Sequence, residues 1–155
     1  MIQRTKIELS EERRILSLMI TSTPFLTNLR NIAEPRLFKS LYSRIIADWV
    51  WEFFEHTKES PGKAIEEIYV KNKHTIRGEE ENDLIAEFLK RLSSDWDELD
   101  IKNIKYTVKN AVEYFKLRSI EEFKESLELA ITNKDIEHGE SLIANYRKID
   151  KQEGE

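Results

Sequence analysis

The feature that most constrains this chain is a long run, residues 103–132, that contains neither proline nor glycine. Its apolar residues recur mostly at steps of three or four, which places them on one face of an α-helix. They are Ile104, Val108, Ala111, Phe115, Phe123, Leu127 and Ala130. At about 1.5 Å per residue, this helix would be on the order of 45 Å long, too long for the middle of a small compact domain. The run therefore predicts a helix that extends beyond a single core.

A second, shorter helix is predicted to follow after a turn at Asn133 and Lys134. Asp135 can cap this helix through its carboxylate. The apolar spacing continues to Asp150 through Ile136, Gly139, Ile143, Tyr146 and Ile149. Residues 103–150 therefore predict a helical hairpin, and residues 151–155 a disordered tail.

The rest of the chain predicts a small helical globule. The 155 residues are enough for one ordinary domain or a small domain with an appendage. Only four glycines and three prolines occur, which disfavours a β fold with many tight turns. We expect an all-α fold, with an N-terminal helical globule over 1–92 and an acidic linker over 93–102.

Start signals divide the globule into helices. Ser10 predicts the cap of a first helix, and Thr23-Pro24 and Ser60-Pro61 predict two further starts, each a cap followed by proline. The segment from Pro35 to about Thr57 is the richest in aromatic residues, so we place it at the centre of the core. Its apolar pattern predicts that Trp49 and Phe53 are buried.

The sequence gives no pattern for catalysis or metal binding. Cysteine is absent, and the four glycines are too scattered to form a phosphate-binding loop. His56, His74 and His138 do not form the paired Glu-x-x-His set of a di-iron bundle. We therefore expect no catalytic, cofactor-binding or metal-binding residues, and no enzyme. The absence of cysteine fits a cytoplasmic protein, which we expect. No apolar run approaches the roughly 20 residues of a membrane span, so we expect no membrane contact.

Charge is distributed unevenly along the chain. Residues 79–100 carry nine acids against Lys90 and Arg91, which predicts either a solvated surface or a docking surface for a basic partner. In the long helix the bases precede the acids, opposite to what the helix dipole favours. Pairing with another chain would explain this order. Tyr106 and Tyr114 among the bases leave weak single-strand binding as an alternative, but the net charge of -5 argues against a DNA contact.

Several segments resemble the N-terminal helical domain and linker hairpin of DnaB-type replicative DNA helicases, especially phage-like ones. The resemblance covers nearly the whole chain in the right order. It rests on Glu11 to Ile20, Phe38, Arg44 and Ile45, Ser60-Pro61-Gly62-Lys63, Asn103-Ile104-Lys105-Tyr106, Glu113 to Ile120, Asn133 to Glu137, and Tyr146 to Ile149.

The resemblance implies a domain that assembles the helicase ring and offers surfaces to primase and to a helicase loader. It does not carry over ATP binding or unwinding, because the motor's phosphate loop is not in this sequence. We predict self-association or partner binding through the hairpin, at Val108, Phe115, Phe123, Leu127, Ile143 and Tyr146. The alternative is a stand-alone all-α regulatory or adaptor protein that acts through the same hairpin.

Overall fold

The computed structural model describes residues 2–96 and 103–149, and side chains from residue 10 onward. Every regular element in these ranges is helical, which confirms the predicted all-α class. The elements are α1 (Ile2–Thr21), α2 (Thr23–Asn28), η1 (Pro35–Leu37), α3 (Leu41–Thr57), α4 (Ala64–Asn72), η2 (Lys73–Thr75), α5 (Glu79–Asp95), α6 (Ile104–Thr132) and α7 (Ile136–Asn145). None of the described helices is long and apolar enough to cross a membrane.

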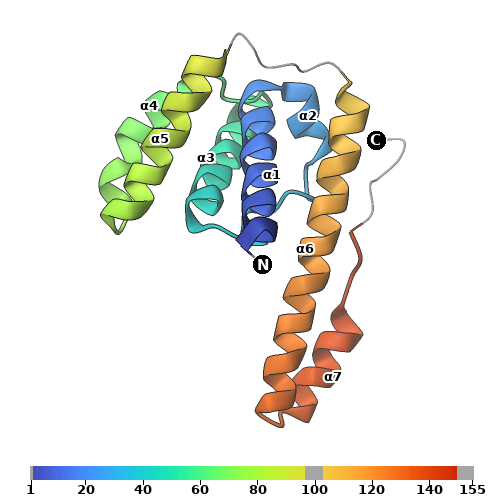
Figure 1. Ribbon diagram of the computed structural model, residues 1–155. Helices are drawn as coiled ribbons and strands as arrows, with labels where there is room; N and C mark the ends of the chain where they lie inside the picture. The colour runs from blue at the N-terminus through green and yellow to red at the C-terminus, as the bar shows by residue number, and fades with distance from the viewer. Residues whose placement is uncertain (1, 97–102, 150–155) are drawn as a thin grey trace.

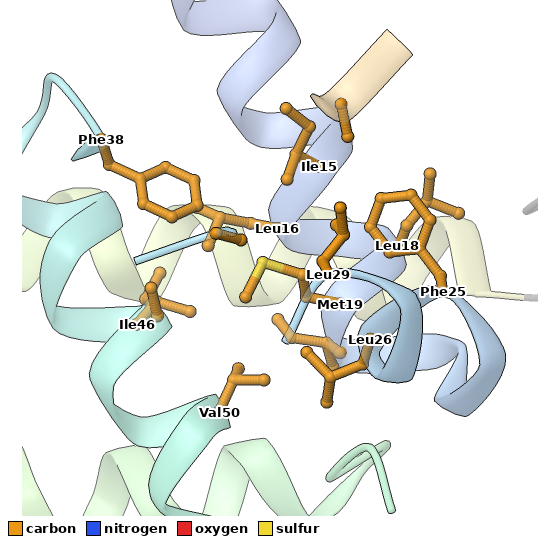
Figure 2. Packing of buried hydrophobic residues seen from close by; sticks show 14 of the residues in the cluster. Ile15, Leu16, Leu18, Met19, Phe25, Leu26, Leu29, Phe38, Ile46 and Val50 are labelled. Carbon is orange, nitrogen blue, oxygen red and sulfur yellow. The ribbon is translucent and has the colours of Figure 1, made fainter. Parts of the chain in front are cut away.

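The core forms where α1, α2 and α3 meet. Figure 2 shows side chains from these helices gathered around Leu16 and Met19 of α1, both fully buried. Leu26 and Leu29 reach them from α2 and its end, and Ile46 from α3. Burial of one such side chain contributes about 1.5–3 kcal/mol, so this cluster anchors the fold.

The predicted start of the first helix at Ser10 is wrong, because α1 begins at Ile2 and Ser10 lies inside it. Nothing between Ile2 and Ser10 breaks a helix, since the segment has neither glycine nor proline. The cap of α2 is Ser22 instead of Thr23, and its hydroxyl accepts a 3.2 Å hydrogen bond from the backbone N–H of Phe25.

Thr23 and Ser60, both predicted as helix caps, bind each other instead. The backbone N–H of Ser60 donates to the Thr23 hydroxyl at 3.1 Å, and the two hydroxyls lie 3.1 Å apart. The helix expected after Ser60 therefore starts later, at Ala64, behind a turn in which Gly62 has a φ of 57°. A left-handed φ of this kind favours glycine.

The predicted third helix is interrupted near its start. η1 ends at Leu37, Phe38 is extended with a ψ of 142°, and α3 begins at Leu41. The Glu12 carboxylate accepts hydrogen bonds from the backbone N–H groups of Lys39 and Ser40, which a continuous helix would have used internally. A tertiary contact therefore ends η1.

The buried face of α3 includes Trp49, as predicted, but not Phe53. Tyr42, Ile46, Val50 and Phe54 are buried at steps of four, and Trp49 is buried beside them. Phe53 is only half-buried, so its predicted burial is wrong. The predicted boundary after Leu92 also falls too early, because α5 continues to Asp95 and the half-buried Trp96 packs against the core.

Residues 97–102 of the predicted linker and 151–155 of the predicted tail lie outside the described residues.

Candidate protein-docking surface on the helical hairpin

The first half of α6 belongs to the core of the globule. Val108, Ala111, Val112 and Phe115 are buried, and this part of the helix packs against α2 and η1. The Phe115 and Phe38 rings pack in a T-shaped arrangement with ring centroids 5.2 Å apart. Val108 and Phe115, predicted as self-association residues, are therefore core residues, because burial inside the chain leaves nothing for a partner to contact.

Polar contacts fix the direction in which α6 leaves the globule. The buried Arg118 donates from Nε to the backbone carbonyl of Leu37 at 2.8 Å. One helical turn further on, Glu122 forms an ion pair with Arg36 of η1. Tyr114 donates from its hydroxyl to the buried carboxylate of Glu12 at 2.7 Å. These contacts hold the middle of α6 against α1 and the segment around η1.

The second half of α6 extends past the globule, and α7 runs back along it (Figure 1). Asp135 caps α7 as predicted, because its Oδ1 accepts a 3.1 Å hydrogen bond from the backbone N–H of His138. α7 ends at Asn145 instead of the predicted Asp150, and Asp150 lies outside the described residues. α6 is thus much longer than α7, and only part of α6 is covered by it.

Two of the predicted docking residues face each other within the hairpin. The rings of Phe123 and Tyr146 meet edge to face with centroids 4.6 Å apart. Near the turn, a Cβ added to Gly139 would lie 3.7 Å from the Cβ of the buried Ala130, which shows how closely α7 approaches α6 there. Phe123 and Tyr146 therefore serve the packing of α7 on α6, and both are only half-exposed.

Large apolar side chains remain on the outside of the hairpin. Ile131 is 73% exposed, Ile136 is 74% exposed and Ile143 is 63% exposed. Leu117 and Ile120 are also exposed, and Leu127 is half-buried. We define the hairpin surface as Leu117, Ile120, Ile131, Ile136 and Ile143.

Of the six residues predicted for docking, only Ile143 belongs to this surface. Leu127, which was also predicted, is half-buried on a second apolar row of α6 that contains Leu117, Ile120 and Ile131, and this row is the signal that could have found those three. Its steps of three, seven and four place it on a helix face of its own, next to the face that α7 covers.

The charged residues of α6 divide along its length. The bases Lys105, Lys109 and Lys116 are exposed on the half that packs on the globule, beside one exposed acid, Glu113. The acids Glu125 and Glu128 are exposed on the projecting half, beside one exposed base, Lys124, which pairs with Glu128 at 3.7 Å. A second hairpin lying antiparallel would bring opposite charges together, whereas a parallel one would bring like charges together.

In the described part of the chain, no three His, Cys, Asp or Glu side chains lie close enough together to hold a metal ion. His56, His74 and His138 are exposed and lie on α3, η2 and α7 respectively.

No protein-family model, curated protein or solved structure matches this chain. The resemblance to DnaB-type helicases therefore stays a prediction.

Proposed function

We propose that this chain is a non-catalytic assembly and protein-docking domain of a replicative DNA helicase, which self-associates through the hairpin surface. The observation that carries the proposal is the exposure of Ile131, Ile136 and Ile143 on a hairpin held in a fixed direction by the globule. Large apolar side chains left exposed together on one hairpin are the basis for proposing an interaction site there. Primase and a helicase loader remain proposed partners through the family resemblance alone.

The hairpin is suited to pair with a second copy of itself. Burying one isoleucine side chain contributes about 1.5–3 kcal/mol. In a symmetric contact the same residue is buried on both copies, so each isoleucine contributes twice. The predominance of bases in the first half of α6 and of acids in the second favours an antiparallel pair, in which Lys116 of one copy lies toward Glu125 of the other. This arrangement gives a physical reason for a charge order that opposes the helix dipole.

Sedimentation velocity at tens of micromolar tests self-association. We expect the unmodified chain to sediment as a dimer or a larger species, and Ile131→Asp with Ile143→Asp to sediment as a monomer. Val70→Asp is the matched control, because Val70 is 61% exposed but lies on α4. A monomeric unmodified chain would refute self-association and leave the hairpin to a different protein.

The helicase assignment has a separate test in the gene. We expect a P-loop ATPase in the same reading frame, or a primase or loader gene beside it. Finding neither would favour the alternative, a regulatory or adaptor protein that acts through the same surface.

A further inference from the structure

The four residues that follow α7 connect the hairpin back to the globule. α7 ends at Asn145, and Tyr146 is extended with a ψ of 130°, so the helix stops there. Figure 1 shows the chain running from the end of α7 back toward the globule. Ile149 is half-buried and packs against the core cluster of the globule. We name residues 146–149 the strap.

α7 has few contacts of its own with α6. It has ten residues, none of them buried, and only Gly139 and Leu142 are half-buried. A helix this short is marginal in water unless other contacts support it. Gly139 lies close to Ala130 near the turn, but further along both helices line a hollow of about 250 Å³. Four polar residues contribute to the lining of this hollow: Ser119, Ser126, Ser141 and Asn145. Continuous apolar packing therefore does not join the two helices there.

The strap supplies support that α7 lacks. The rings of Tyr146 and Phe123 pack with their centroids 4.6 Å apart, which holds the end of α7 on α6. Arg147 donates from Nη1 to the backbone carbonyls of Ala144 and Tyr146, at 3.3 and 3.0 Å. A cation at these carbonyls opposes the negative end of the helix dipole. Ile149 then fastens the strap to the globule.

We propose that the strap controls whether the hairpin surface is complete. While Ile149 is seated on the globule, α7 stays on α6 and presents Ile136 and Ile143. When Ile149 is displaced, α7 detaches and the surface loses these two residues. α6 keeps its direction, because Arg118 bonds the carbonyl of Leu37 independently of the strap. A protein that binds the strap would thus disable docking at the hairpin surface. The effect on self-association rests on the proposed function, whereas the effect on α7 does not.

Hydrogen exchange of the full chain tests the strap. We expect the amides of α7 to be protected in the unmodified chain. Ile149→Asp removes the apolar anchor and should speed their exchange by about tenfold or more, while α3 and the first half of α6 keep their protection. Leu129→Asp is the matched control, because Leu129 is 63% exposed on α6, and it should leave the exchange of α7 unchanged. Unprotected amides in α7 of the unmodified chain, or unchanged exchange in Ile149→Asp, would overturn the proposal.

A disulfide between α7 and α6 provides the second arm. A Cβ added to Gly139 lies 3.7 Å from the Cβ of Ala130, within the range of about 3.5–4.5 Å that disulfides need. Ala130→Cys with Gly139→Cys should therefore tie α7 to α6, and restore slow exchange and self-association to Ile149→Asp. Self-association that stays lost although α7 is tied would overturn the proposal, because Ile149 would then contact the partner directly. A monomeric unmodified chain would refute the proposed function instead, and the exchange rates of α7 would then decide on the strap alone.

Discussion

The hydroxyl of Tyr114 on α6 donates a 2.7 Å hydrogen bond to the fully buried carboxylate of Glu12 on α1. The same carboxylate accepts from the backbone N–H of Lys39 and from the hydroxyl of Ser40, the latter at 3.1 Å. One side chain therefore joins the first helix, the entry to α3 and the hairpin's long helix. A buried carboxylate is retained at low cost only where hydrogen bonds replace its hydration.

This junction predicts a coupled loss of stability. Tyr114→Phe removes one hydrogen bond to a charged group and should cost about 1.5–3 kcal/mol of unfolding free energy. Glu12→Ala should cost more, because it also leaves the N–H groups of Lys39 and Ser40 without their acceptor. Urea denaturation of both single variants and the double variant gives the coupling energy. Strictly additive losses would show that Tyr114 and Glu12 do not act together.

At Arg118 we expect the packing of the side-chain stem to contribute more to stability than the charge does. Its Nε bonds the carbonyl of Leu37, but its Nη1 is buried without a hydrogen bond and lies 3.9 Å from a carboxylate oxygen of Glu121. Arg118→Met keeps the apolar stem and removes the imperfectly satisfied charge, so we expect a loss of only about 1 kcal/mol. Arg118→Ala also removes the stem and should cost about 3 kcal/mol. Equal losses would mean that the charge, not the packing, holds α6 to η1.

The orientation of α3 can be checked with two aromatic residues. Trp49→Ala should lower the free energy of unfolding by about 3–5 kcal/mol, because Trp49 is buried and its ring lies 6.3 Å from that of Tyr69. Phe53→Ala should cost less than about 1.5 kcal/mol, because Phe53 is only half-buried. The reverse order of the two losses would show that α3 is rotated from the orientation described above.

The Asp48 carboxyl on α3 makes the free energy of unfolding depend weakly on pH. Partial burial, and then the negative charge of Glu52 one turn away, raise the pKa of Asp48 above its usual 3.8. A carboxyl with a raised folded pKa destabilises the fold when it is charged, and this effect disappears once it is protonated in both states. Asp48→Asn should therefore stabilise the chain at neutral pH, by less than about 1 kcal/mol because solvent still reaches the partly buried side chain and screens its charge.

Thermal unfolding at neutral pH and at about pH 3 checks the sign of this effect. The gain from Asp48→Asn should shrink toward zero at the lower pH. A gain that is equal at both values, or that grows on acidification, would contradict the assignment to the charge of Asp48.

Helical periodicity predicted much of this fold, and local start signals predicted less. The long helix ends at Thr132 as expected, and Asp135 caps the next one, because these features depend on residues close in sequence. The helix caps predicted at Thr23 and Ser60 were wrong. Each hydroxyl could cap a helix locally, but the Thr23 hydroxyl instead binds Ser60, which is distant in sequence. The break before α3 depends on Glu12, which is far away in sequence.

The sequence predicted a docking surface on the hairpin, but it did not predict most of the residues that are exposed there. An apolar stripe on a long helix does not reveal which part meets the chain's own core and which part meets a partner. Phe115 belongs to the first class because Phe38 packs on it, and Phe123 is covered by Tyr146. Ile143 is the one predicted docking residue among those that define the hairpin surface, because its side chain is 63% exposed.

The most direct measurement of the central claim is the distance between copies of the hairpin. The chain contains no cysteine, so Leu129→Cys on α6 and Val70→Cys on α4 each introduce a single site for a nitroxide label. Pulsed electron resonance on the labelled full chain should give a narrow intermolecular distance for Leu129→Cys and a longer distance for Val70→Cys. A shorter distance for Val70→Cys, or no intermolecular signal from Leu129→Cys, would contradict association through the hairpin.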